Sequence, residues 1–162
     1  MEKMEELYAR LSYEARLYKN QLTLLQKEIE KLTLASLDTS NALRTIQSLQ
    51  QGDVLVPVGG SSFVKGIVTD DKVLLGIGSG YVIEVDKETA AKKIKEREET
   101  TKETINKIAQ EYSKILAKFE AVSKQLQDLE TQIMLERREK EVTREDYAVS
   151  YTHLTLPTIY SV

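Results

Sequence analysis

The chain has 162 residues and contains no cysteine, no tryptophan, two prolines and a single histidine. Without cysteine it can form neither a disulfide nor a thiolate metal site. The one histidine, His153, lies close to the C-terminus, so no serine–histidine–aspartate set can be assembled in the body of the chain. We therefore expect no enzymatic activity, no metal and no cofactor.

Charge of one sign and long hydrophobic runs are also missing. The formal net charge is −3 and no stretch consists only of lysine and arginine, so nothing favours nucleic acid as a ligand. No apolar run approaches the roughly 20 residues of a membrane-spanning helix. The first residues, Met1–Glu6, do not have the form of a signal peptide. These absences predict a cytoplasmic protein with neither a nucleic-acid nor a membrane partner.

What the chain does contain is a pair of heptad repeats on either side of a short glycine-rich middle. Core positions recur three and four residues apart from Met1 to Ile46, and again from Ala91 to Ile133. Such a spacing over many heptads favours a coiled coil over an ordinary amphipathic helix. We expect the two helices to pack antiparallel as a hairpin that buries its seam and little else.

The boundaries of the elements follow from caps and breakers. We expect the first helix to run from near Met4 to near Gln51, with Gly52 as a left-handed stop. The second should begin after Asp86, a good N-cap, and end near Asp146. The chain then divides into helix 1–51, β-hairpins 53–85, helix 87–146 and an uncharged tail 149–162. We interpret the tail as vector-derived; a natural disordered tail is the alternative.

The middle segment has the pattern of two β-hairpins. Runs rich in valine and isoleucine alternate with glycine, serine and aspartate, which is typical of short strands and tight turns. Pro57 cannot donate to a ladder, so either the first strand is an edge or Pro57 sits on its open side. Gly76–Gly80 is interpreted as a turn and not as a phosphate loop, because another strand pattern follows it. The strands are apolar on both faces and need cover, which we expect other subunits to supply.

One antiparallel register aligns the whole seam, with partner numbers that sum to about 137. It places Leu11 opposite Leu126, for example. The same register puts two polar layers near the hairpins, Ser36 with Thr101 and Thr39 with Glu98. Those layers either specify the register or loosen the joint between the helices; we favour the first reading, because single polar core positions commonly act in that way.

At the free end of the predicted hairpin, apolar residues gather where little can cover them. Exposed apolar groups of this kind usually mark binding surfaces, and methionine suits adaptable contacts. Fraying of the helix ends is the simpler alternative. This tip cluster consists of Met1, Met4, Leu7, Tyr8, Leu11, Ile133, Met134 and Leu135.

The middle segment also carries a family resemblance. Val54–Gly66, with the sequence VLVPVGGSSFVKG, and Lys72–Glu84, with the sequence KVLLGIGSGYVIE, resemble the α-type subunit of archaeal prefoldin. The order of one helix, two hairpins and a second helix matches, and the likeness extends over about residues 4–145.

The resemblance implies an α+β fold, a long antiparallel coiled-coil hairpin with two β-hairpins inserted between the helices, whose strands complete an oligomeric β-barrel. It implies an ATP-independent holdase in which two α-type and four β-type subunits assemble. The tip cluster would then bind non-native polypeptide and pass it to a group II chaperonin. The assembly residues would be Val54, Val56, Val58, Phe63, Ile67, Val73, Leu75, Tyr81, Ile83 and Val85.

Two other functions remain open from the sequence. Open strand edges allow a structural protein that polymerises into filaments. A tethering adaptor, with one defined partner at the tip cluster, is the second alternative.

Overall fold

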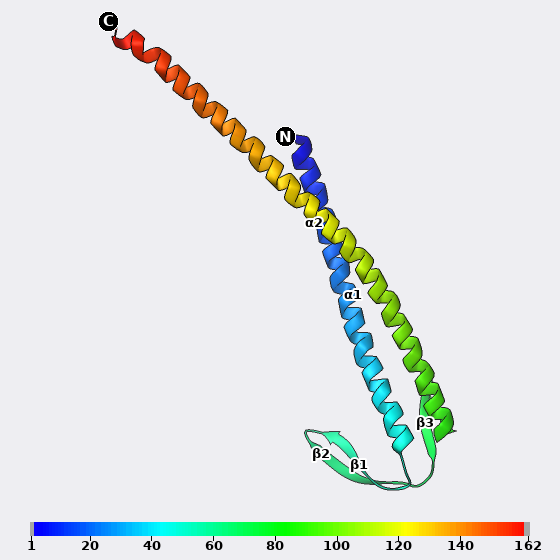
Figure 1. Cartoon of the computed structure of the whole chain (residues 1–162). Helices are drawn as coiled ribbons and strands as arrows, with labels where there is room; N and C mark the ends of the chain where they lie inside the picture. Colours follow the sequence, from blue (N-terminus) through cyan, green and yellow to red (C-terminus); the bar gives the residue numbers. More distant parts are fainter. Residues whose placement is uncertain (1, 161–162) are drawn as a thin grey trace. The chain divides into compact units, whose positions relative to one another are not determined.

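A computed structural model describes residues 2–160, with side chains described through residue 148. Two small β-hairpins lie between two long helices in the chain order, as the sequence predicts (Figure 1). The elements, in chain order, are α1 (Glu2–Ser48), β1 (Gly52–Gly59), β2 (Ser62–Val68), β3 (Lys72–Gly78), β4 (Tyr81–Asp86) and α2 (Lys87–Tyr160).

The chain divides into two compact units. The hairpin unit comprises Leu25–Glu111, which includes all four strands, the second half of α1 and the start of α2. The terminal unit comprises the described residues on either side, that is 2–24 of α1 and 112–160 of α2.

The terminal unit has a narrow core on the predicted seam. Leu11, Val122 and Leu129 are buried, and partly buried apolar side chains pack against them. Tyr8 Oη donates a 2.7 Å hydrogen bond to Glu130 Oε1, one residue from the position predicted to face Tyr8. The antiparallel register is therefore confirmed in this unit. The partly buried neighbours are Met4, Tyr8, Ala15, Tyr18, Leu126 and Ile133.

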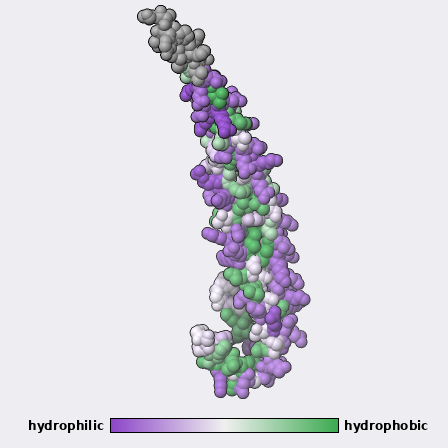
Figure 2. Space-filling model, turned by 60° about the vertical axis from the view of Figure 1, so that its left-hand side comes forward, coloured by the Kyte–Doolittle hydropathy of each residue, from purple (hydrophilic) through white to green (hydrophobic). Residues whose placement is uncertain are grey.

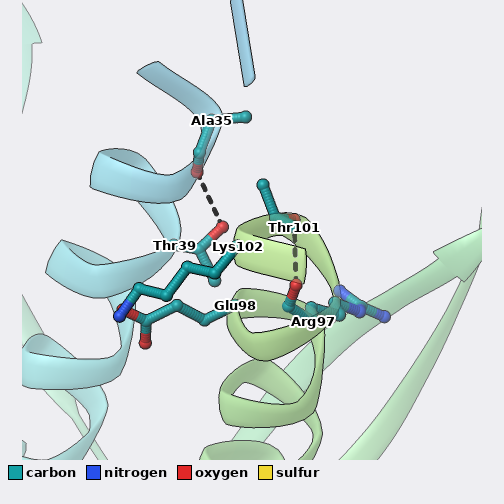
Figure 3. Close-up of polar contacts among 6 residues, drawn as sticks. All are labelled: Ala35, Thr39, Arg97, Glu98, Thr101 and Lys102. Atoms are coloured by element: carbon teal, nitrogen blue, oxygen red, sulfur yellow. Dashed lines mark hydrogen bonds and ion pairs between the residues drawn. The ribbon is translucent and has the colours of Figure 1, made fainter. Parts of the chain in front are cut away.

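In the hairpin unit the helical seam contains the predicted polar layers. The side chains of Ser36, Thr39 and Thr101 are half-buried. The Glu98 side chain is only 13% exposed and pairs with Lys102 of its own helix at 3.1 Å. Both of these side chains point from α2 toward α1 (Figure 3).

No hydrogen bond or ion pair crosses the seam at these layers within the described side chains. The Thr39 hydroxyl donates to the Ala35 carbonyl at 2.8 Å, and the Thr101 hydroxyl donates to the Arg97 carbonyl at 2.9 Å (Figure 3). Each helix thus satisfies its own polar groups, as Ser and Thr commonly do in helices. The polar layer occupies positions where apolar side chains could be buried, and it forms no hydrogen bond between the helices. It is therefore a weak point of the seam.

The four strands form two separate antiparallel pairs, β1 with β2 and β3 with β4, so every strand is an edge. The two hairpin loops are Gly60-Ser61 and Ser79-Gly80, and all four residues have positive φ. Two-residue loops of this kind match the twist of the strands they join. The glycine-rich segment before Tyr81 is therefore a hairpin turn, as predicted.

The first helix ends earlier than the sequence predicts. The helix stops at Ser48, whose hydroxyl donates to the carbonyls of Arg44 and Thr45 and tightens the last turn. The Lys87 ammonium donates to the Leu49 carbonyl at 2.8 Å and so satisfies the group that follows. Gly52, predicted as the left-handed stop, has φ of 125° and opens β1 instead.

The second helix continues farther than predicted. It was expected to end near Asp146, yet α2 extends to Tyr160 through most of the predicted tail. Between Gly80 and Pro157 the sequence has neither glycine nor proline, so nothing stops propagation of the helix once it has formed. The vector origin of this stretch stays a prediction, and residues 161–162 lie outside the described part of the chain.

Asp86 immediately precedes α2, where the sequence predicts the start of the helix. Its Oδ1 accepts a 2.9 Å hydrogen bond from the Thr89 hydroxyl. That bond, together with backbone hydrogen bonding and the nearby Lys72 charge, lowers the pKa of Asp86 below its ordinary value of 3.8, against the opposing effect of burial. The ionised form is thus favoured in the folded chain, next to the positive end of the helix dipole.

Replacing the polar layers with Thr39→Leu, Glu98→Leu and Thr101→Leu together should raise the free energy of unfolding by about 1–2 kcal/mol, because an ion pair and two hydroxyls give way to apolar packing. Urea unfolding at fixed protein concentration, followed by circular dichroism, measures this. Thr104→Leu is the matched control, since its hydroxyl also donates to its own helix but at an exposed position. Lower stability in the triple variant would contradict the weakness of the layer.

Asp86→Asn should reduce stability at pH 7 but not in strong acid. A carboxyl whose pKa is lowered on folding adds stability above its unfolded pKa, and this is lost as the pH falls through the folded pKa. The difference in free energy of unfolding between wild type and variant should therefore disappear as the pH falls below 3.8, the ordinary pKa of this carboxyl. Unfolding curves from pH 7 to pH 2 measure it, with Asp38→Asn as the charge-matched control. A gap that persists at pH 2 would show that the carboxylate charge is not the cause.

Candidate binding and assembly surfaces

The tip cluster lies in the terminal unit, and its members differ in exposure. Leu11 is buried, and Met4, Tyr8 and Ile133 are half-buried against the seam. The exposed members are Leu7 at 37%, Met134 at 70% and Leu135 at 54%. Met1 lies outside the described residues. The cluster therefore has a packed base, which keeps the helices together, and an exposed part made of three side chains.

A cleft of about 460 Å³ opens beside this cluster. Its lining includes the apolar Ile133 and Met134 together with Tyr8. The rim carries Glu130, which accepts the hydrogen bond from Tyr8, and Glu5, which pairs with Arg137 at 3.8 Å. Since Glu5 and Arg137 are both more than half exposed, that pair adds little stability and can open easily.

The hydrogen bond to Glu130 also affects the pKa of the Tyr8 phenol. It raises the pKa of the Tyr8 phenol above its ordinary value of 10.0, with the Glu130 charge as the next cause. A phenol is protonated at neutral pH even without this shift, so Tyr8 is available there as the donor to Glu130. The sequence reading found the apolar members of this surface but missed its polar rim. Glu130 is at a flank position of the heptad, where charge normally indicates only a solvated face.

Beyond the cluster, α2 continues past the N-terminus of α1 (Figure 1). Every described side chain from Arg137 to Ala148 is exposed. The seam positions there turn polar, with Glu136, Lys140 and Thr143 following Ile133. The apolar seam therefore stops close to where α1 starts, and the sequence does not provide this stretch with a coiled-coil partner.

The second hairpin has one wholly apolar face, and that face is already covered. Leu75 is 5% exposed, and Val73, Ile83 and Val85 are half-buried within the hairpin unit. Arg97 Nη2 donates a 2.6 Å hydrogen bond to the Gly76 carbonyl and so joins α2 to β3.

Leu75 is thus buried within its own unit, and its contribution to assembly stays a prediction. Its three half-buried neighbours lie on the same covered face, and their contribution to assembly stays a prediction. The outward side of this hairpin shows Leu74 at 73% and Val82 at 58% exposure. Burial by a helix of the same chain decides between two similar apolar faces, and the strand pattern alone does not contain that information.

The first hairpin has no such cover. Its face with Val54, Val56 and Val64 is wholly apolar, while Asp53 and Lys65 lie on the other face. Val56 is 44% and Val64 51% exposed. Hydrophobic residues are visible at the surface over the hairpins, at the bottom of the view in Figure 2. The other predicted assembly residues are also exposed, namely Val58, Phe63, Ile67 and Tyr81.

Nothing in the described part of the chain resembles a catalytic or metal centre. No cluster of three or more potential metal-binding side chains occurs among the described residues. Asp70 and Asp71 serve local structure: Asp70 accepts a bond from the Lys72 amide, and Asp71 accepts one from Gln51. Within residues 2–160, no helix is both long and apolar enough to span a membrane.

Comparison with known proteins places this fold in a family. A family model described as prefoldin subunit matches residues 18–132. Prefoldin subunit alpha of Pyrococcus horikoshii is 30% identical over 111 residues, covering 62% of this chain and 75% of that protein. Prefoldin subunit alpha of Methanobrevibacter smithii is 29% identical over 129 residues, covering 75% and 88%. A cryo-EM structure of filamentous PFD from Methanocaldococcus jannaschii is similar, with a TM-score of 0.59, 28% identity, and coverage of 68% and 96%.

Proposed function

The chain belongs to the prefoldin family as an archaeal α-type member, and on that premise we propose that it is a subunit of an ATP-independent chaperone that holds non-native polypeptide. The observation that carries this proposal is the exposed part of the tip cluster. Leu7, Met134 and Leu135 stand in solvent beside a cleft with an apolar lining and a polar rim. Flexible methionine and leucine side chains can contact many sequences weakly, which suits a holdase.

Weak single contacts hold a client when several act together. Each copy of the tip cluster offers only a few side chains, so one copy binds and releases easily. Several copies in one assembly raise the local concentration of sites and give avidity without tight contact at any one of them. Release then needs no ATP, because each contact opens on its own.

We propose that assembly uses the first β-hairpin and unites two α-type with four β-type subunits in a β-barrel. The uncovered apolar face of β1 and β2 supports this, because an exposed two-stranded sheet is marginal alone. The open edges of all four strands offer further pairing. The proposed acceptor of the held polypeptide is a group II chaperonin, with the acidic start Glu2, Glu5 and Glu6 as its candidate contact.

A second candidate is a filament-forming structural protein. The similarity to filamentous PFD from Methanocaldococcus jannaschii favours it, and the same open edges would serve end-to-end growth. Native mass of the purified chain, alone and mixed with a β-type partner, separates the two functions. A discrete complex supports the chaperone assembly, and an open-ended mass distribution supports the filament.

Val56→Asp with Val64→Asp should prevent both kinds of assembly while helical circular dichroism remains. The two residues face each other on the uncovered side of the hairpin, and two carboxylates there cannot be buried without large cost. Ser61→Asp with Thr69→Asp, which adds the same charge at exposed turn positions, is the control and should assemble normally. Assembly of the Val56/Val64 variant would remove this face from the interface.

Leu7→Ser, Met134→Ser and Leu135→Ser together should abolish suppression of aggregation of several unrelated unfolded proteins, and leave assembly and helix content unchanged. The measurement is light scattering after dilution from denaturant. Leu24→Ser, Leu34→Ser and Leu37→Ser form the matched control, because these leucines are 66%, 68% and 59% exposed outside the tip cluster. Undiminished suppression by the first variant would exclude the tip cluster. If the wild-type protein suppressed the aggregation of only one client, the tethering adaptor would be favoured.

A further inference from the structure

The two helices of the terminal unit differ on their solvent faces. On α1, the face opposite the seam carries Tyr13 at 60%, Leu17 at 44% and Leu24 at 66% exposure. These positions are 4 and 7 residues apart, so they form one stripe along the helix. On α2, no large apolar side chain is exposed from Lys87 to Ile133 within the described residues. Exposure of this kind is therefore not a general property of this two-helix coil.

The same face of α1 is basic. Between Ala9 and Leu24 the only acidic residue is Glu14, and its carboxylate accepts a 3.0 Å hydrogen bond from the seam residue Tyr18. Arg10 and Arg16 lie beside the apolar stripe and form no ion pair within the described residues. A chain of net charge −3 thus has a local apolar face edged by two uncompensated guanidinium groups.

We propose that this outer face of α1 docks an acidic amphipathic helix of a partner protein. The stripe spans about 16 Å at 1.5 Å per residue, which is the length of three helical turns. A helix with apolar residues at a 3,4 spacing packs its ridge along Tyr13, Leu17 and Leu24. Its flanking carboxylates meet Arg10 and Arg16, and the guanidinium fork binds carboxylate well.

The partner that this face fits differs from the polypeptide held at the tip cluster. Capture at the tip cluster depends on a few exposed apolar side chains and accepts many sequences. The outer face adds charge selection and a fixed helical spacing, which favour one class of folded or folding segment. The docked helix would be a third helix packed on the coiled coil and would leave the tip cluster free.

The test uses a fluorescein-labelled peptide of three heptads with leucine at the core positions and glutamate on the flanks. A matched peptide carries lysine in place of every glutamate. Titration with the intact protein, followed by fluorescence anisotropy, should show saturable binding of the acidic peptide. The basic peptide should bind at least about tenfold more weakly, because two attractive pairs become repulsive.

Arg10→Glu with Arg16→Glu should weaken binding of the acidic peptide roughly tenfold and leave suppression of client aggregation unchanged. Lys114→Glu with Lys124→Glu makes the same charge change on α2 and should alter binding less than about twofold. A variant with Tyr13→Ser, Leu17→Ser and Leu24→Ser should abolish binding of the acidic peptide.

Three results would overturn the proposal. Equal binding of the acidic and basic peptides would indicate unselective apolar capture. Loss of binding in the Leu7, Met134 and Leu135 serine variant would place the peptide at the tip cluster. A fall in self-association of the peptide-free Arg10/Arg16 variant in analytical ultracentrifugation, with no change in peptide binding, would assign the face to a second copy of this chain.

Discussion

The limited capacity of a two-helix seam governs the rest of this structure. Two packed helices bury one stripe each, and the buried side chains described in the terminal unit are accordingly few: Leu11, Leu22, Val122 and Leu129, each still 7–8% exposed. Every further apolar residue must remain partly in solvent or find cover from another chain. Exposed apolar groups beside the seam are therefore a direct result of the architecture. Which of them bind something depends on the polar groups that surround them.

The two β-hairpins show how the same local pattern leads to different surfaces. Both have an apolar face, but β3 and β4 turn theirs into the hairpin unit, where Leu75 is buried. The matching face of β1 and β2 remains exposed at Val56 and Val64. The second hairpin is thus partly buried by its own chain, whereas the apolar face of the first is left exposed. This division gives the unit a fixed base and one surface that remains available for assembly.

Much of the fold follows from the sequence, because periodicity and capping are local. The heptads predict the helices, the glycine-rich turns predict the hairpins, and Asp86 predicts the start of α2, all confirmed here. The predicted end of α1 near Gln51 was wrong, because Ser48 and Lys87 satisfy the last carbonyls and Gly52 does not serve as the stop. The covered face of β3 and the polar rim at Glu130 depend on residues far away in sequence. No local pattern contains that information.

The antiparallel connection also sets an order in which contacts can form. Lys87 and Leu49 are separated by 38 residues, whereas Tyr8 and Glu130 are separated by 122. Closing the shorter loop costs less chain entropy, so loop closure favours contacts beside the strands over those at the two chain ends. The exposed part of the tip cluster thus lies where helix pairing carries the largest loop-closure cost.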